Sequence, residues 1–253
     1  MKNENLYEQE KKQAGWFDKH YSQFSKENYK LENWRLSMLN RIFETPFKSK
    51  VKTYLDIGCG ATGYTTIEAA KRNNWLSFGV DISIEAMLRA NNLAKKQGVD
   101  DRTAFLVCSA ESLPFRPGSI DYISAISVLE HLEADEKAIR SLYAILKENR
   151  YLYICVPNTY KRMWPFLWPI YLYLDHQIGH KRHYSIEALN KKMEKDERFE
   201  MEEVFYNAHL IKLFQLILDK FYLLDEEKWW VMEKRDINKN HFGIQLNAIY
   251  RKK

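Results

Sequence analysis

Features that this sequence lacks exclude several classes of protein. No apolar run reaches the length of about 18 residues that a helix needs to cross a bilayer. The 253 residues include three cysteines, Cys59, Cys108 and Cys155, without a C-x-x-C spacing, so we expect neither a disulfide framework nor a zinc site. Internal repeats and low-complexity tracts are absent as well. The sequence favours a globular protein of a reducing compartment, and we expect it in the cytoplasm.

Charge of one sign is not concentrated anywhere in the chain. Lys and Arg are spread along the whole length, and the formal net charge is +5 at pH 7. A dispersed excess of this size is typical of a solvated basic surface, so we expect no nucleic-acid partner. Residues 1–12 are polar and charged, which argues against a signal peptide. A hydrophobic content of 45% suffices for one large domain or a domain with appendages.

A short glycine-rich stretch is the most informative part of the sequence. Residues 54–63 read YLDIGCGATG, in which the first four residues favour a buried strand. Gly58, Gly60 and Gly63 then precede a helical pattern that begins near Thr65. Glycines at this spacing allow a sharp turn and a close approach of the backbone to a ligand, beside the free N–H groups of a helix start. The stretch predicts a ligand-binding turn.

Two acidic residues indicate what kind of ligand the turn binds. Asp56 lies two residues before Gly58, and Asp81 ends the next apolar run. A carboxylate at the end of the second strand of a parallel sheet can accept hydrogen bonds from both hydroxyls of a ribose. These residues therefore predict a nucleoside cofactor without saying which one.

In combination with residues 110–115 (AESLPF) and residues 121–131, this pattern resembles the class I S-adenosylmethionine-dependent methyltransferases. The resembled subgroup is the small-molecule enzymes around the ubiquinone and menaquinone methyltransferases, and the resemblance covers roughly residues 50–160. It implies S-adenosylmethionine as cofactor and S-adenosylhomocysteine as product. A dehydrogenase is disfavoured because it normally lacks an acid at the position of Asp56. The cofactor-binding residues that the resemblance implies are Asp56, Gly58, Cys59, Gly60, Gly63, Asp81, Ile82, Ala110, Glu111 and Ser127.

Strand and helix patterns alternate from Lys52 onward, which predicts an α/β fold with helices on both faces of a parallel sheet. The resemblance implies a doubly wound sheet of seven strands, mostly parallel, with the last strand antiparallel beside the sixth. A helix before the fifth strand carries Ile139, Leu142, Tyr143 and Leu146 on one face. The predicted strands are 53–57, 77–81, 104–108, 122–126, 151–156, 199–206 and 242–251, and further helices are 65–72, 84–97, 209–224 and one from about 186.

The segments that flank this core are predicted to cover the cofactor. Apolar residues from Leu31 to Phe43 recur at helical spacing, which predicts a helix that ends near Pro46. The helix either lies over the pocket as a lid, as the resemblance implies, or packs on the sheet edge. We divide the chain into an N-terminal helical lid, 1–48, and a cofactor-binding domain, 49–253. Under the lid hypothesis the residues that shield the pocket are Trp16, Phe17 and Tyr21.

Two insertions, 158–185 and 207–240, are candidates for contact with the acceptor. The first contains twelve apolar residues, 163–174, which are too few to span a membrane. They form a lid over the acceptor, contact a membrane surface through Trp and Tyr, or pack against the protein body or a second subunit. Because the predicted helix 209–224 is also largely apolar, we expect a small, apolar or lipid-linked acceptor, with peripheral membrane contact and a homodimer as further possibilities.

Histidines provide the candidates for acceptor chemistry. His131 follows the fourth strand, where the resembled enzymes place acceptor-side residues, and an imidazole is half ready as a general base near neutral pH. His180 is the second candidate for the general base, and His183 is a rival to it. The alternative for His131 is that it only orders a loop. The sequence ISVL at 126–129 replaces the Asn/Asp-Pro-Pro-Tyr block of enzymes that methylate DNA or protein amides. The expected reaction is therefore O-methylation of a small molecule; the alternatives are a sugar or protein side chain as acceptor, or cofactor binding without turnover.

A metal site is not expected from the sequence. His176, His180 and His183 lie close together, but their spacing provides no helical i, i+4 scaffold beyond the first pair. Asp175 is the only acid nearby.

Overall fold

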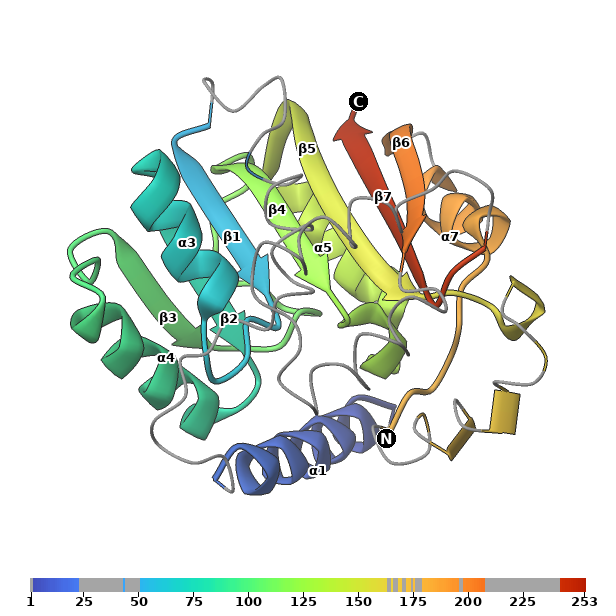
Figure 1. Cartoon of the computed structure of the whole chain (residues 1–253), viewed down its shortest axis with the longest axis horizontal. Helices are drawn as coiled ribbons and strands as arrows, with labels where there is room; N and C mark the ends of the chain where they lie inside the picture. Colours follow the sequence, from blue (N-terminus) through green and yellow to red (C-terminus); the bar gives the residue numbers. More distant parts are fainter. Residues whose placement is uncertain are drawn as a thin grey trace, which may run out of the picture.

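One seven-stranded sheet forms the centre of the molecule, with strand order β3-β2-β1-β4-β5-β7-β6 (Figure 1). The computed structural model describes residues 2–22, 43, 51–162, 165, 168, 169, 172, 173, 175, 179–195, 198–207 and 242–253. The strands are β1 (Thr53–Ile57), β2 (Leu76–Asp81), β3 (Thr103–Val107), β4 (Ile120–Ile126), β5 (Leu146–Pro157), β6 (Phe199–Asn207) and β7 (Gln245–Lys252). The helices are α1 (Lys2–Ser22), α3 (Tyr64–Asn73), α4 (Ile84–Lys96), α5 (Asp135–Ile145), α7 (Ile186–Met193) and the short 3₁₀ turns η2 (Leu129–His131) and η3 (Tyr160–Arg162).

The predicted fold class is confirmed. Strands β1 to β5 pair in parallel, whereas β7 runs antiparallel to both β5 and β6. The strand order reverses between β1 and β4, and ligands of open parallel sheets bind outside the carboxyl ends of the strands at such a switch point. The topology therefore places a binding site where the glycine turn emerges from β1.

Successive residues of β1 show how the two faces of the sheet are covered. Leu55 and Ile57 point into an aliphatic core shared with α5 and α7. Tyr54 points to the opposite face, which α3 and α4 cover, and packs in an aromatic cluster with Trp75 and Tyr122. Burial of aliphatic and aromatic side chains on both faces is what a doubly wound sheet requires, and it holds the strand ends in place.

The N-terminal segment contains a helix whose bounds the sequence did not give. Residues 2–22 form α1, a 21-residue helix, within the segment 1–48 that the sequence analysis assigned to a helical lid. In Figure 1 this helix (blue) runs beneath the carboxyl ends of the parallel strands. The helix predicted over residues 31–46 lies outside the described residues, except for Phe43, which is helical and buried in the aromatic cluster.

The start of β5 is the largest error in the predicted strands. Helix α5 ends at Ile145, and Leu146 is the first residue of β5, paired with Ile120, instead of the last residue of a helical face. Asn149 has a left-handed φ of +57°, and the register of the pair β4–β5 shifts nearby. A turn conformation inside the strand hides its first residues from a pattern of alternating hydrophobicity. Other boundaries shift by a few residues, and β1 has the predicted bounds.

Part of the insertions lies within the described residues. Segment 207–240 and its predicted helix 209–224 fall outside them, apart from Asn207 at the end of β6. In segment 163–174, Trp168, Leu172 and Tyr173 are described and are 37%, 55% and 65% exposed. Among the described helices, none combines the length and the apolar character needed to cross a bilayer.

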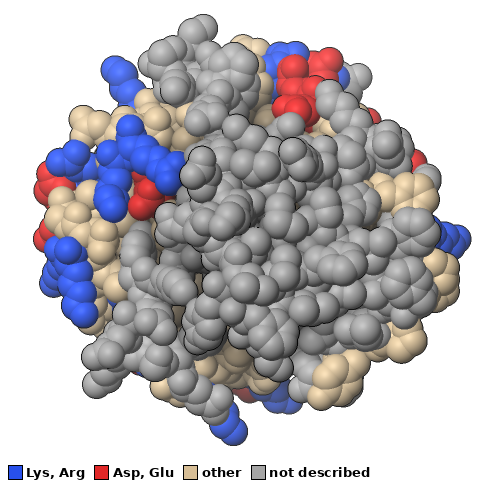
Figure 2. Space-filling model, in the orientation of Figure 1, with Lys and Arg blue, Asp and Glu red and all other residues tan. Residues whose placement is uncertain are grey.

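Charged side chains of both signs lie together on the visible surface. In Figure 2, Lys and Arg stand beside Asp and Glu at the edge of the view that α3 and α4 occupy in Figure 1. Arg72 pairs with Glu68 within α3, and Arg102 pairs with Asp101 in the turn before β3. This edge therefore carries the mixed charge of a solvated surface.

Asp121 fixes the amino ends of β1 and β4. Its carboxylate accepts hydrogen bonds from the backbone N–H groups of Lys52 and Thr53, each at 3.0 Å, and from Lys147 Nζ at 2.8 Å. Burial by itself raises the pKa of Asp121, but these donors outweigh it and the pKa lies below its ordinary value. The ionised carboxylate therefore stabilises the folded state.

We expect Asp121→Asn to lower the free energy of unfolding by about 2 kcal/mol at neutral pH, since hydrogen bonds to a charged group contribute about 1.5–3 kcal/mol each. The lowered pKa sets the pH dependence. The contribution is complete above the ordinary aspartate pKa of about 3.9 and is lost as the pH falls through the lower pKa of the folded state. Urea unfolding at a series of pH values measures this, with Asp101→Asn as the exposed control. A difference between wild type and variant that persists at acid pH would contradict the assignment.

Candidate functional site

A pocket opens at the carboxyl ends of the strands, as the switch point predicts. It encloses about 760 Å³ of space, open solvent at its mouth included. The ends of β1, β2, β3 and β4 form its floor, and α1 closes one side. The lining residues are Glu10, Gln13, Phe17, Tyr21, Ile57, Gly58, Val80, Asp81, Ile82, Cys108, Ser109, Ala110, Glu111, Ser127, Val128, His131, Leu132 and Glu133.

Asp81 ends β2 and lines this pocket with an anchored carboxylate. One oxygen accepts a hydrogen bond from the N–H of Gly60 and the other from the N–H of Ser83, both at 3.0 Å. A carboxylate has about four acceptor positions, so capacity remains for two donors of a ligand. Burial raises the pKa of Asp81, and the backbone N–H groups oppose that rise. The group suits a ligand that brings a pair of hydroxyl donors.

The turn after β1 needs glycine for two separate reasons. Gly58 has a left-handed φ of +65°, and a Cβ placed there would lie 2.4 Å from Val128 Cγ2. Ser127, the residue before Val128, also has a left-handed φ, +55°, which is uncommon outside glycine and tends to occur at functional sites. The backbone of the turn after β1 therefore lies against the Val128 side chain, which follows β4, at the floor of the pocket.

Glu111 lies buried at the pocket wall with unused acceptor capacity. One of its oxygens accepts the N–H of Ala134 at 3.3 Å. The other has no hydrogen-bond partner among the described residues, and the Lys137 ammonium lies 3.8 Å from it. Burial raises the pKa of Glu111, while the Ala134 N–H and the Lys137 charge act in the opposite direction. A ligand that donates an amino hydrogen would satisfy this oxygen.

Helix α1 contributes polar contacts to the pocket that the sequence does not reveal. Ser109 Oγ donates to Glu10 Oε1 at 2.7 Å, and Gln13 Nε2 donates to the backbone carbonyl of His131 at 3.2 Å. Phe17 packs edge-on against the His131 ring at 5.9 Å between centroids. Glu10 and Gln13 were not predicted as site residues, because isolated polar residues on a polar helix carry no periodic signal.

Asp18 attaches α1 to the start of α4. Its carboxylate accepts hydrogen bonds from Ser83 Oγ and from the N–H of Glu85, and Ser83 Oγ in turn caps α4 at the N–H of Ala86. An acid at a helix N-terminus is also favoured by the helix dipole. This contact keeps α1 over the pocket.

We expect Asp18→Asn to increase the rate of amide hydrogen exchange in α1 about tenfold, because a charged hydrogen bond of about 1.5 kcal/mol is weakened and 1.4 kcal/mol corresponds to a factor of ten. Exchange followed by mass spectrometry measures the effect. Glu8→Gln, an exposed change on the same helix, is the matched control. Unchanged exchange in the Asp18 variant would show that the contact does not hold the helix.

The structure separates the predicted cofactor residues into two groups. Gly58, Asp81, Ile82, Ala110, Glu111 and Ser127 line the pocket, whereas Asp56, Cys59, Gly60 and Gly63 are not among its lining residues. Asp56 is buried and accepts a hydrogen bond from Ser124 Oγ at 2.7 Å. Cys59 packs against Met87, and burial raises the pKa of its thiol well above the ordinary value. Of the predicted shielding residues, Phe17 and Tyr21 line the pocket, and Trp16 is 44% exposed.

His131 lines the pocket from the turn after β4, two strands away in the sheet from Asp81 at the end of β2. Its Nδ1 lies 3.3 Å from the carbonyl oxygen of Gly179, and since a carbonyl only accepts, Nδ1 carries the proton and Nε2 is left as an acceptor. Burial, with the nearby His180 second, lowers the pKa of His131 to about 4, so the ring is neutral at pH 7. His180 does not line the pocket; its ring lies behind His131, 5.0 Å away between centroids.

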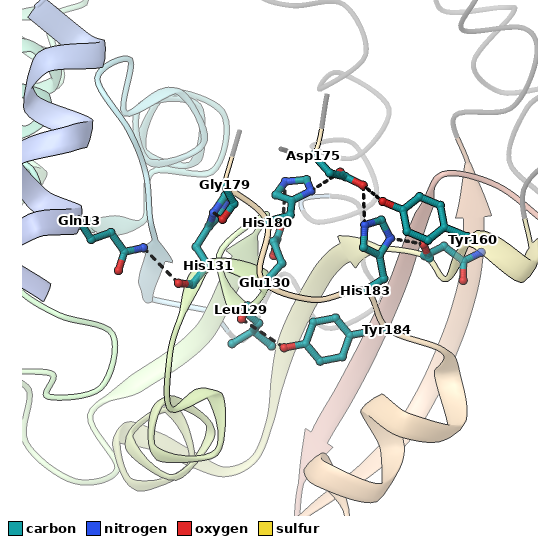
Figure 3. A network of polar contacts seen from close by, with 11 residues as sticks. Gln13, Leu129, Glu130, His131, Tyr160, Asp175, Gly179, His180, His183 and Tyr184 are labelled. Atoms are coloured by element: carbon teal, nitrogen blue, oxygen red, sulfur yellow. Dashed lines mark hydrogen bonds and ion pairs between the residues drawn. The ribbon is translucent and has the colours of Figure 1, made fainter. Parts of the chain in front are cut away.

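His180 belongs to a polar network that ends at Asp175 (Figure 3). Asp175 contacts His180 Nδ1 at 2.6 Å and His183 Nε2 at 2.7 Å, and it accepts the hydroxyl of Tyr160. Burial raises the pKa of Asp175, but the Tyr160 hydrogen bond and the His183 charge outweigh it and the pKa is lowered. The network returns segment 179–184 of the chain to the turn η2, where Lys181 N–H donates to the Glu130 carbonyl.

Comparison with known proteins assigns the family of this arrangement. A family model described as a methyltransferase domain matches residues 48–228. The chain belongs to this methyltransferase family. Its cofactor is S-adenosylmethionine, as the resemblance to class I enzymes implied, and that resemblance is confirmed.

Named relatives of this methyltransferase act on several acceptors. The chain is 36% identical over 104 residues to norajmaline N-methyltransferase of Rauvolfia serpentina. The aligned residues cover 41% of this chain and 35% of the relative. The chain is 37% identical over 93 residues to 27-O-demethylrifamycin SV methyltransferase of Amycolatopsis mediterranei, covering 37% and 34%. The chain thus spans about a third of the length of these relatives. Geranyl diphosphate C-methyltransferase from Streptomyces coelicolor A3(2) shares the fold, with a TM-score of 0.64, 17% identity and coverage of 89% and 80%.

The pocket fits S-adenosylmethionine on its own geometry. Asp81 has acceptor capacity for two ribose hydroxyls, and a buried oxygen of Glu111 is without a hydrogen-bond donor among the described residues, as the amino group of an adenine would require. At Gly58 the absence of a Cβ makes room for the Val128 side chain, and both residues line the pocket where the amino-acid part of the donor would bind. These residues would hold the cofactor, and a bound S-adenosylmethionine supplies a methyl group activated by its sulfonium charge.

Proposed function

We propose that this methyltransferase methylates an apolar small molecule at oxygen. The observation that carries the proposal is the lining of the pocket, which combines the Asp81 carboxylate at the end of β2 with the His131 imidazole after β4, two strands further along the sheet. Phe17, Val128 and Leu132 add apolar side chains to the same lining. Such a pocket aligns an apolar acceptor with the methyl donor, and alignment is the main requirement of a displacement whose donor is already activated.

His131 is the proposed catalytic residue of the acceptor side. Because its Nδ1–H is donated to Gly179, its Nε2 is the nitrogen that can accept the proton of an acceptor hydroxyl. The lowered pKa of about 4 keeps the ring neutral and able to accept, but it makes His131 a weaker base than the half-ionised imidazole that the sequence suggested. Phe17 packs edge-on against the ring and adds an apolar contact beside it. His180 supports His131 from behind and is proposed as a positioning residue, in place of the direct role as a second base that the sequence suggested.

A lipid-linked acceptor is supported by exposed apolar side chains in the insertion after β5. Trp168, Leu172 and Tyr173 are more than one third exposed, and aromatic residues of this kind are typical of membrane-interface segments. We propose that segment 163–174 contacts a lipid surface that supplies the acceptor. Co-flotation with liposomes tests this, with Tyr173→Ser as the variant; binding that is absent, or unchanged in the variant, would contradict it. Size-exclusion chromatography determines whether the segment serves a homodimer instead.

The acceptor class is tested with methyl-labelled S-adenosylmethionine. The purified chain is incubated in parallel with prenylated phenols, aliphatic amines, sugars and a peptide mixture, and label in each product is counted. We expect transfer to the phenols. Transfer confined to amines, sugars or peptides would contradict O-methylation of an apolar acceptor, and cofactor binding without transfer to any of them would favour a binding protein without turnover.

A further inference from the structure

Three side chains that are common metal ligands converge behind the acceptor end of the pocket (Figure 3). Glu130 and His131 come from η2, and His180 comes from the segment that follows Gly179. Each offers one ligand atom, and the three atoms lie within 4.8 Å of one another. One carboxylate and two imidazoles around a point of this size can bind a single divalent ion.

Glu130 indicates independently that a cation belongs there. Its side chain is fully buried, and neither carboxyl oxygen has a hydrogen-bond partner within the part of the chain that the structure describes. The nearest cation-forming group is His180, whose Nε2 lies 4.0 Å from Glu130 Oε1. A buried carboxyl group without donors costs several kcal/mol, and a bound metal ion is one of the few partners that compensates this cost.

Both histidines already have the tautomer that a metal ligand requires. His180 Nδ1 contacts Asp175 at 2.6 Å, so its Nε2 is directed to the side of Glu130. His131 Nδ1 contacts the Gly179 carbonyl, which leaves Nε2 as its available nitrogen. Metal-binding histidines donate their second N–H to a carboxylate or a carbonyl in this way, because the contact fixes the ring and the tautomer. Asp175 is itself held by Tyr160 and His183.

A second group, Asp175, His180 and His183, also has ligand atoms within 4.8 Å. Its members contact each other directly, at 2.6 Å and 2.7 Å, so the two carboxyl oxygens of Asp175 already have partners. Metal–ligand bonds of about 2.0–2.2 Å from a central ion would need these atoms to separate. Asp175 therefore serves as the support behind His180, and Glu130 as the ligand.

We propose that Glu130, His131 and His180 bind one divalent transition-metal ion of the zinc, manganese or iron class. Imidazole ligands disfavour Mg²⁺ and Ca²⁺, which prefer oxygen. Three protein ligands leave coordination positions open, and since His131 lines the pocket, an open position faces the acceptor. The proposal differs from the prediction made from the sequence, which was that no metal site is present.

The role of the ion, unlike its binding, rests on the proposed function. A metal-bound acceptor hydroxyl loses its proton to water more easily, as bound water does. In the metal-bound enzyme His131 therefore acts through the ion and not as the base itself.

Titration of the tag-free, chelator-treated chain with Zn²⁺ or Co²⁺ alone tests the site. Elemental analysis after dialysis should give one ion per chain, Zn²⁺ should raise the melting temperature, and Mg²⁺ should not compete. Glu130→Gln and His180→Gln should each weaken binding by more than about 100-fold, since loss of even a supporting residue costs about 10- to 100-fold. Circular dichroism verifies the fold of each variant. If the Glu130→Gln variant is unfolded, metal binding by the His180→Gln variant decides the test.

His183→Gln is the matched control, because it alters a histidine of the same network outside the proposed ligand set and should retain binding within about 10-fold. Absence of stoichiometric binding to the folded wild type, or binding that survives Glu130→Gln, would overturn the proposal. So would a loss in His183→Gln alone, which would place the ion at Asp175. Neither cofactor nor acceptor is present, so these outcomes are distinct from a failure of methyl transfer.

Discussion

Asp81→Asn should weaken the binding of S-adenosylhomocysteine by about 100-fold. The carboxylate is already anchored by the N–H groups of Gly60 and Ser83, and its remaining acceptor positions are the ones that two ribose hydroxyls need. Hydrogen bonds to a charged acceptor contribute about 1.5–3 kcal/mol each, asparagine accepts at one oxygen only, and 1.4 kcal/mol corresponds to a factor of ten. Isothermal titration calorimetry measures the loss directly.

Two comparisons make this result specific. Glu85→Gln removes a half-buried acid that pairs with Arg89 in the first turn of α4. Because Glu85 does not line the pocket, this change should leave the affinity within about twofold. Because burial raises the pKa of Asp81, binding by the wild type should begin to weaken, as the pH falls, at a higher pH than an ordinary aspartate with a pKa of about 3.9 would allow. Equal affinities of Asp81→Asn and wild type would refute the assigned role.

Gly58→Ala should have the second large effect. The new Cβ would meet Val128 Cγ2 at 2.4 Å, and the backbone has a φ that costs a non-glycine residue about 1–2 kcal/mol. Val128 lines the pocket, so its displacement should reduce the affinity for S-adenosylhomocysteine by about 100-fold in addition to the loss of stability. Calorimetry and thermal unfolding measure the two effects separately.

Gly98→Ala provides a control for backbone strain alone. Gly98 has nearly the same φ, +66°, but no atom lies within 4 Å of the position of its Cβ. It should lose about 1–2 kcal/mol of stability and retain the full affinity. If Gly58→Ala retained its affinity as Gly98→Ala does, the close approach of the two turns would have no importance for the cofactor. The double change Gly58→Ala with Val128→Ala should recover part of the binding.

The sheet was predictable because its signals are local. Residues 53–57 are β-formers that end at a glycine turn, and every parallel strand in this chain is followed by its own helix or turn, so patterns of hydrophobicity locate them. Asp81, at the end of β2, could be predicted to line the ligand pocket from its place in the strand order alone, since topology brings the strand ends together. The first residues of the strands were less predictable, as β5 shows. The turn conformation at Asn149 interrupts the alternation of apolar and polar residues on which the strand prediction depends.

The position of α1 over the pocket and the proposed metal site could not be predicted, because both depend on polar contacts between residues far apart in the sequence. Glu10, Gln13 and Asp18 hold α1 by single hydrogen bonds to residues far away in the sequence, which no periodicity records. Glu130 stands out in the sequence only as the neighbour of His131. Its complete burial, and its approach to His180, depend on how the segment after β5 returns to η2.

The most direct test of the cofactor site is a crystal structure of the chain with S-adenosylhomocysteine. We predict that both ribose hydroxyls lie within hydrogen-bonding distance of Asp81, that the adenine amino group contacts Glu111, and that Phe17 of α1 covers the ligand. A nucleoside bound elsewhere, or an Asp81 carboxylate turned to solvent with the ligand present, would contradict the account.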